Sequence, residues 1–204
     1  MVKISSKIQK YTDPWEHYVI DDFLSHDRFE EIKNLLTVEE EYLELFGFYT
    51  RSNHYFRFEK KDVIPEINEV FNYLFPDRDK NLKKVNHWTI HPANFDYNLH
   101  IDNKSRLYTA VLYLKPENNI GTFVAKNRSE FVDNHQSPSL DSEYTKEIKF
   151  KPNRLFVHKS DPYTWHAFAS STQRCTYNTF LIDPAFVEEG RPEKDKKFHI
   201  DINN

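Results

Sequence analysis

The feature that most constrains this chain is a succession of short β-type segments in its second half. After about Lys84, stretches rich in β-branched and aromatic residues alternate with turn signals. We expect strands near Val85–Ile90, Asn98–Ile101, Leu107–Leu114, Thr122–Ala125, Glu147–Phe150, Leu155–His158 and Thr176–Ile182. About seven short strands at this spacing favour an antiparallel sandwich or barrel. The pattern therefore predicts a mainly β (α+β) fold of the jelly-roll kind.

The segment that precedes these strands has a different periodicity. A short strand is expected at Tyr18–Ile20, and Ser25 after it can cap a helix. Leu24 and Phe29 stand at the positions of a hydrophobic staple. Apolar residues then recur at helical spacing and predict one buried face, made of Phe29, Ile32, Leu35 and Leu36.

A second helix is expected from Pro65 to about Leu74. Pro65 suits the first turn of a helix, and Pro76 ends it. The buried stripe of this helix should consist of Ile67, Val70, Phe71 and Leu74. Because both helices come before the β-rich part, we expect them to pack on one sheet of the jelly roll.

The length of the chain favours one domain. Its 204 residues match the usual size of a single domain. We place the N-terminal strand and helix region at about 15–80, the jelly-roll core at about 85–184 and a charged tail at 188–204. The polar stretch Asn127–Thr145 is long for a simple connection, so it should form either a disordered excursion or, as our candidate, a lid over a substrate.

Composition excludes several classes of protein. A single cysteine, Cys175, rules out an internal disulfide framework and a multi-cysteine zinc site, and it fits a cytoplasmic protein. Only 3 glycines leave no room for a Gly-rich phosphate loop. The net charge of -4 comes from interspersed acids and bases, which argues against a nucleic-acid partner. No apolar run is long enough to predict a membrane span.

The triplet His100-Ile101-Asp102 has the pattern of a metal-binding strand. Residues i and i+2 of a strand point to the same face, about 6.6 Å apart, so both side chains can reach one cation. His166 follows 64 residues after Asp102, and a jelly roll can bring such distant segments to one mouth. Two histidines and one carboxylate on one face of a metal form the facial triad of non-haem Fe(II) oxygenases.

The open positions of such a metal can accept a 2-oxo acid and then dioxygen. The distal carboxylate of the 2-oxo acid needs an anchor, and Arg174 lies eight residues after His166. A guanidinium binds a carboxylate through two parallel hydrogen bonds, which lysine cannot do. Thr176 should share the face of Arg174, whereas Cys175 should point the other way into packing.

These motifs resemble those of the Fe(II)/2-oxoglutarate-dependent oxygenase superfamily, in its prolyl-4-hydroxylase-like branch. The order and spacing are similar over most of the chain: His100-x-Asp102, then Trp165-His166, then Arg174-x-Thr176. The stretch from Tyr18 to Ser25 is similar to the opening of many members. The resemblance implies a double-stranded β-helix with N-terminal helices.

The same resemblance implies cofactors and further site residues. Fe(II) would be held by His100, Asp102 and His166, and 2-oxoglutarate would be the cosubstrate. Tyr113 matches a tyrosine that often contacts 2-oxoglutarate in the family, and His91 takes the place of a second tyrosine. Many members have a Gly-Gly pair where only Gly121-Thr122 stands here, and Asn153 replaces a usual glycine.

The implied reaction is hydroxylation of an unactivated C–H bond, with release of succinate and carbon dioxide. Related halogenases have a small residue at the place of Asp102, so the carboxylate favours hydroxylation. The substrate could be a prolyl residue of a protein or a small molecule. Aromatic residues expected around it are Trp88, Phe95, Tyr97 and Tyr108. The oligomeric state does not follow from the sequence.

Each candidate also has a plainer interpretation. A second triplet of the same form, His199-Ile200-Asp201, lies in the charged tail without a downstream histidine or arginine, and we regard it as a chance match. We expect His158 to be a hydrogen-bonded structural histidine and Arg106 to form a surface salt bridge. Tyr97, taken alone, would more often be a core residue than a ligand contact.

Two other functions remain compatible with the fold. A cupin-like jelly-roll metalloenzyme would bind iron without 2-oxoglutarate, and Arg174 would then have no cosubstrate to hold. A non-catalytic jelly-roll binding protein would be expected to lack one of the ligands. This chain retains His100, Asp102, His166 and Arg174 together, which favours the oxygenase.

Overall fold

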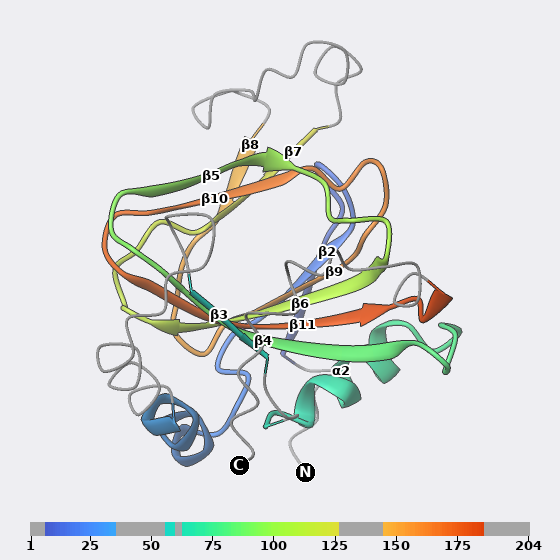
Figure 1. The fold of residues 1–204 in the computed structure, drawn as a ribbon, viewed down its shortest axis with the longest axis horizontal. Helices are drawn as coiled ribbons and strands as arrows, with labels where there is room; N and C mark the ends of the chain where they lie inside the picture. The colour runs from blue at the N-terminus through green and yellow to red at the C-terminus, as the bar shows by residue number, and fades with distance from the viewer. Residues whose placement is uncertain (1–6, 36–55, 60–62, 127–144, 186–204) are drawn as a thin grey trace.

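The computed structural model describes residues 7–35, 56–59, 63–126 and 145–185. Two antiparallel β-sheets face each other across the interior (Figure 1). The large sheet has the strand order β1-β2-β9-β6-β11-β4-β3, and the small sheet has the order β5-β10-β7-β8. The large-sheet strands are β1 (Ile8–Tyr11), β2 (His17–Ile20), β3 (Phe56–Glu59), β4 (Lys83–His91), β6 (Arg106–Lys115), β9 (Leu155–Lys159) and β11 (Arg174–Ile182). The small-sheet strands are β5 (Phe95–His100), β7 (Thr122–Ala125), β8 (Thr145–Ile148) and β10 (His166–Ser170).

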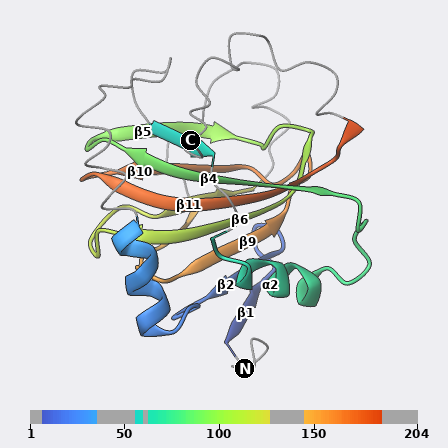
Figure 2. The ribbon, with the colours of Figure 1, turned by 60° about the horizontal axis from the view of Figure 1, so that its bottom comes forward.

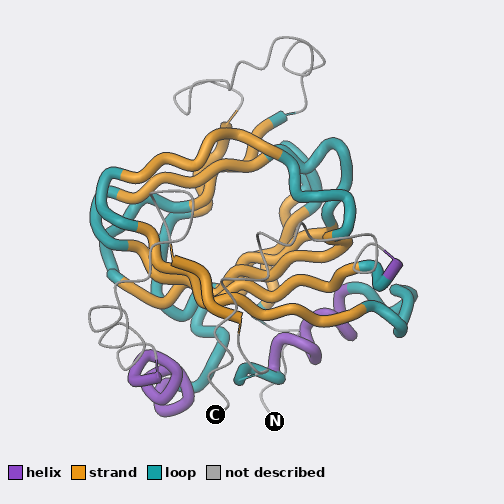
Figure 3. Tube along the Cα trace, viewed as in Figure 1, coloured by secondary structure: helices purple, strands orange, loops and turns teal. Residues whose placement is uncertain are grey.

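Two helices cover the outer face of the large sheet. One spans residues 26–35, and the other is α2 (Glu66–Leu74). Figures 2 and 3 show both on the side of the large sheet that faces away from the small sheet. Their buried residues, such as Ile32 and Phe71, belong to the same apolar cluster as Trp88, Leu112 and Tyr177 of the sheet. This packing confirms that the N-terminal helices buttress one sheet of a jelly roll.

Alternation along the large sheet separates its apolar face from the face that lines the interior. In β11, Cys175 and Tyr177 join the cluster under the helices, whereas Arg174, Thr176 and Asn178 line a pocket between the sheets. This arrangement confirms the expected opposite directions of Cys175 and of its two neighbours. The strand therefore presents a polar row to the interior because its apolar row is already packed.

Most expected elements are present, with some shifts in their bounds. β8 begins at Thr145 and ends at Ile148, so it lies two residues before the expected segment. β1, β3 and β10 were not predicted. The first expected helix is present, but Leu35 is 43% exposed and does not belong to the buried stripe. Leu36, most of the lid segment Asn127–Thr145 and the tail 188–204 lie outside the described residues.

The turn before β9 shows why asparagine can replace the usual glycine there. Asn153 has a φ of 63°, which lies in the left-handed region that asparagine tolerates. Its side-chain amide also contacts both backbone polar groups of Leu24, accepting from the nitrogen and donating to the oxygen at 2.9 Å. Arg154 holds the same turn through a two-pronged ion pair with Asp21. The turn is thus fixed to the N-terminal segment by side chains.

No helix in the described ranges is long and apolar enough to cross a membrane.

Candidate metal centre

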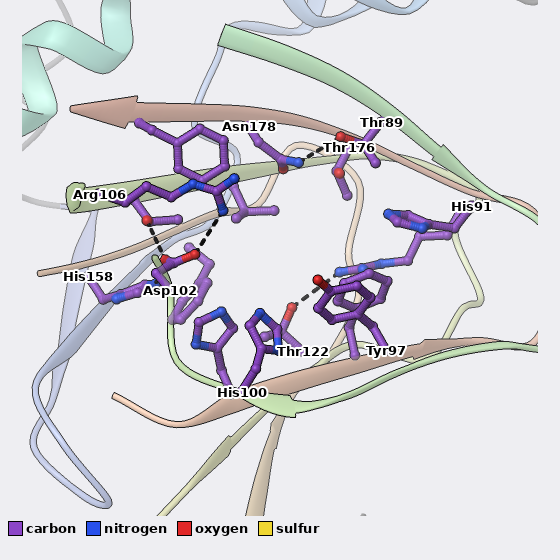
Figure 4. A pocket seen from close by; sticks show the side chains of 17 residues that line it. Thr89, His91, Tyr97, His100, Asp102, Arg106, Thr122, His158, Thr176 and Asn178 are labelled. Carbon is purple, nitrogen blue, oxygen red and sulfur yellow. Dashed lines mark hydrogen bonds and ion pairs between the residues drawn. The ribbon is translucent and has the colours of Figure 1, made fainter. Parts of the chain in front are cut away.

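A pocket lies between the inner faces of the two sheets. In Figure 4, Thr89, Thr176 and Asn178 belong to the large sheet, whereas His100 and Thr122 approach from the small sheet. The pocket contains all three expected metal ligands, together with Arg174, Thr176 and His91. The fold therefore brings these sequence-distant residues into one site.

His100, Asp102 and His166 lie close enough to bind one ion. One possible ligand atom from each side chain lies within 4.8 Å of the others. His100 is the last residue of β5 and His166 the first of β10, and the two are paired in register. Their rings are 4.4 Å apart between centroids. Asp102, however, lies in the loop after β5 and not within the strand, so the expected strand alternation does not fix its direction.

His166 has the protonation pattern of a metal ligand. Its Nδ1 lies 2.9 Å from the carbonyl oxygen of Thr164, so Nδ1–H donates there and Nε2 keeps a free lone pair. Burial lowers the pKa of His166, although the charge of Asp102 opposes the change. A neutral imidazole is the form that binds a metal. The donor set of two imidazoles and one carboxylate therefore fits Fe(II).

Asp102 is a buried carboxylate with several donors around it. Arg106 Nη1 lies 2.9 Å from Oδ1, and Thr109 Oγ1 lies 2.7 Å from Oδ2. Burial opposes ionisation, but the positive charge of Arg106 and the hydrogen bond from Thr109 help to hold the pKa of Asp102 well below its usual range. Arg106 thus pairs with a buried carboxylate inside the pocket, and the expected surface salt bridge is wrong.

At the other end of the pocket, Arg174 is 2% exposed and has no acidic partner among the described residues. Its Nη2 donates to Thr122 Oγ1 at 3.2 Å, and Nε has no hydrogen-bond partner. The guanidinium lies 4.3 Å from the ring centroid of Phe168. Burial lowers the pKa of Arg174 to about 10. A buried cation without a counter-ion is costly, so this end of the pocket is suited to an anion.

The three other expected cosubstrate contacts lie at different depths. Thr176 and His91 line the pocket. Tyr113 is fully buried behind it, and its hydroxyl donates to Thr122 Oγ1 at 2.7 Å. Tyr113 does not line the pocket, but it contacts Thr122, which also accepts from Arg174, and its ring centroid lies 5.4 Å from the Arg174 guanidinium.

The expected aromatic surroundings are only partly correct. Tyr97 is 37% exposed, lines the pocket and stacks on Phe168 with an interplanar angle of 3°, so its interpretation as a core residue is wrong. Trp88 belongs to the cluster beneath the helices, and Tyr108 packs against that cluster. Phe95 stacks against His91 at 5.0 Å between ring centroids. The aromatic rings that line the pocket come from both sheets: Tyr97 and Phe168 from the small sheet, Phe156 and Phe180 from the large sheet.

His158 is completely buried, as expected for a structural histidine. Its Nδ1 lies 3.2 Å from the carbonyl oxygen of Lys159. Its Nε2 faces Asp102 Oδ2 at 3.8 Å, a contact that the sequence did not indicate. His158 is therefore part of the wall behind Asp102.

Several polar residues of the site were missed in the sequence. Thr109 and Ser160 bond to Asp102, Thr122 bonds to Arg174, and Asn178 lines the pocket. Asn178 could have been found, because it lies four residues after Arg174 and so on the same face of β11. Ser160 and Thr122 contact residues 58 and 52 positions away in the sequence, so no spacing signal marks them. Thr109 lies only seven residues after Asp102, but a turn separates the two, so strand alternation does not relate them.

No protein-family profile matches this sequence, and no curated protein is similar to it in sequence. Solved structures are similar in fold. A Pseudomonas putida prolyl-4-hydroxylase has a TM-score of 0.55 at 14% identity, with 81% of this chain and 91% of that chain covered. A Trichoplax adhaerens prolyl hydroxylase, in complex with a hypoxia inducible factor peptide fragment, has a TM-score of 0.58 at 15% identity, with 85% and 87% covered.

A third similar structure contains ligands. HygX from Streptomyces hygroscopicus, with nickel and 2-oxoglutarate bound, has a TM-score of 0.55 at 14% identity, with 82% of each chain covered. The chain thus has the double-stranded β-helix fold of prolyl-4-hydroxylase-like Fe(II)/2-oxoglutarate oxygenases.

Proposed function

We propose that this chain, built on the fold of the prolyl 4-hydroxylases, is an Fe(II)- and 2-oxoglutarate-dependent oxygenase that hydroxylates an unactivated C–H bond. The observation that carries the proposal is the pairing of two features in one pocket. A His-Asp-His group able to hold a metal lies at one end, and the buried Arg174 without an acidic partner lies at the other. A cosubstrate with a chelating 2-oxo acid and a second carboxylate satisfies both.

The metal end would be formed by His100, Asp102 and His166. Their donor atoms approach from β5, β10 and the loop after β5, so they would occupy one face of Fe(II) and leave the other face to ligands. Bound Fe(II) would supply the dioxygen chemistry that converts 2-oxoglutarate to succinate and carbon dioxide and hydroxylates the substrate.

The anchor end would bind the distal carboxylate of 2-oxoglutarate. Arg174 offers Nε and the remaining guanidinium hydrogens, and Thr176 adds a hydroxyl on the same face of β11. Tyr113 donates to Thr122 and so orients the oxygen that accepts from Arg174. Burial of Arg174 keeps water from competing for this carboxylate.

The substrate would enter beside Tyr97, whose ring forms an exposed part of the pocket wall. This ring could contact a prolyl residue of a protein or a small molecule, and the two classes remain equal candidates in our proposal. Asp102 favours hydroxylation over halogenation because its carboxylate would occupy the position that a halide needs.

The proposal is tested by measuring succinate formed from 2-oxoglutarate with Fe(II) and dioxygen, by NMR. We expect slow turnover of the wild-type protein without a substrate and none above background for Asp102→Ala. Asp79→Ala is the matched control, because Asp79 is an exposed carboxylate outside the pocket. Succinate formation by Asp102→Ala at the wild-type rate would contradict the proposal.

A further inference from the structure

The carboxylate of Asp102 is held by groups other than the candidate ligands. Oδ2 accepts from Thr109 Oγ1 at 2.7 Å and from Ser160 Oγ at 3.2 Å. Oδ1 accepts from Arg106 Nη1 at 2.9 Å, and Figure 4 shows Arg106 directed at Asp102. These donors come from the start and middle of β6 and from the residue after β9. The large sheet therefore fixes a side chain whose own backbone lies in a loop.

A count of lone pairs shows which oxygen can still accept a ligand. A carboxylate offers about four acceptor positions, two on each oxygen. The two hydroxyls occupy both positions on Oδ2, and Arg106 occupies one on Oδ1. His158 Nε2, at 3.8 Å from Oδ2, is too distant for a hydrogen bond and closes that side sterically. Oδ1 therefore has the free acceptor position within the described part of the chain.

We infer that Thr109 and Ser160 are positioning residues that hold Oδ2 of Asp102 and so orient its carboxylate toward the metal site. The inference rests on the proposed function, since it takes Asp102 as a metal ligand. Thr109 is 3% exposed, and its bond is the shorter of the two. It therefore contributes more to the orientation. Residues that orient a ligand in this way change metal affinity by about 10- to 100-fold when they are replaced.

The test is a Co²⁺ titration of the metal-free protein, followed by visible absorption. Thr109→Val keeps the shape of the side chain but removes the donor, and we expect Co²⁺ to bind about 10- to 100-fold more weakly. The Co²⁺ absorption should also change, because Oδ2 becomes free to bind the ion as well. Thr109→Ser restores a hydroxyl and should recover most of the affinity and the wild-type absorption.

Thr179→Val is the matched control. Thr179 is fully buried on β11, donates to Asn86 Oδ1 at 2.9 Å and does not line the pocket. The Thr179→Val variant thus loses a buried hydrogen bond as Thr109→Val does, but one that does not involve Asp102. We expect its affinity for Co²⁺ to equal that of the wild type, so a general loss of stability cannot imitate the result.

The outcomes separate this inference from the proposed function. If the wild type binds Co²⁺ and Thr109→Val binds it equally well with the same absorption, the inference is overturned and the proposed function is unaffected. If the wild type binds no Co²⁺, both are overturned. Should Thr109→Val not fold, Ser160→Ala takes its place, because Ser160 is only partly buried. We expect a smaller loss of affinity there, and no loss would overturn the inference.

Discussion

The two ends of the pocket treat their buried charges differently. At the metal end, the carboxylate of Asp102 is ion-paired with Arg106 and hydrogen-bonded to Thr109. At the anchor end, the guanidinium of Arg174 has one hydroxyl partner and no acidic partner among the described residues. Both are charged groups withdrawn from water, and withdrawal is costly unless the charge is compensated. The metal end has its compensation within the chain. The anchor end would obtain it from a ligand.

This difference indicates how the two ends would contribute to binding. Groups that are already oriented lose little freedom when a metal arrives, which favours affinity. An uncompensated cation instead stores an unfavourable free energy that an anion removes on binding. The comparison predicts that the two arginines of the pocket have opposite effects on the stability of the ligand-free protein.

Replacement of each arginine by methionine gives the largest expected difference. Arg106→Met would leave Asp102 buried without its ion pair, and we expect the free energy of unfolding to fall by about 1–3 kcal/mol. This loss is smaller than for a fully buried pair because the Arg106 side chain is 24% exposed. Arg174→Met removes a buried cation that lacks a counter-ion, and we expect a gain of about 1–3 kcal/mol.

Urea denaturation of the metal-free variants measures both effects. In a second arm of the experiment, the wild type and Arg174→Met are denatured in excess 2-oxoglutarate and Fe(II), without oxygen. We expect the ligands to stabilise Arg174→Met less than the wild type, because the variant keeps the contribution of the metal but binds 2-oxoglutarate more weakly. A fall in stability for Arg174→Met as large as that for Arg106→Met would break the comparison, because it would mean that Arg174 is already compensated.

A smaller effect is expected from pH. Burial lowers the pKa of His158 and of His166, both at the metal end, whereas the pKa of Arg174 at the anchor end is about 10. A histidine with a lowered pKa in the folded state stays neutral there while the unfolded chain takes up a proton. The contribution of these two histidines to the free energy of unfolding is therefore complete above about pH 6.5. It falls as the pH drops below that value, by up to ~1.4 kcal/mol per pH unit for each group.

Urea denaturation between pH 7.5 and pH 5 of His158→Phe and Arg174→Met tests this assignment. We expect His158→Phe to lose less stability on acidification than the wild type, because phenylalanine cannot take up a proton. Arg174→Met should follow the wild-type slope. An unchanged slope in His158→Phe would show that the acid sensitivity originates elsewhere in the molecule.

The sequence predicted those parts of the molecule that depend on local pattern. The periodicity of Ile32 and Phe71 indicated the faces of two helices, and alternation in β11 placed Arg174 and Thr176 opposite Cys175. The positive φ of Asn153 also followed from its residue type. In each case the cause lies within a few residues of the chain.

The remaining features depend on contacts between distant segments. β10 has only five residues, His-Ala-Phe-Ala-Ser, and none of them is β-branched, so the segment carries little strand signal of its own. Tyr97 and Trp88 are both aromatic residues of strands, yet one lines the pocket and the other lies under the helices. Among the partners of Asp102, Ser160 lies 58 residues away, so the sequence around Asp102 gave no sign of it.

The most direct test of the central claim is a titration of the anaerobic, Fe(II)-loaded protein with 2-oxoglutarate, followed by visible absorption. Chelation of the metal by a 2-oxo acid gives a weak charge-transfer band. We predict that the band appears in the wild type and requires about 100-fold more 2-oxoglutarate in Arg174→Met, because a charge-assisted hydrogen-bond pair of about 3 kcal/mol is lost. A wild-type protein that binds Fe(II) but gives no band at any concentration would contradict the account and favour a cupin-like metalloenzyme.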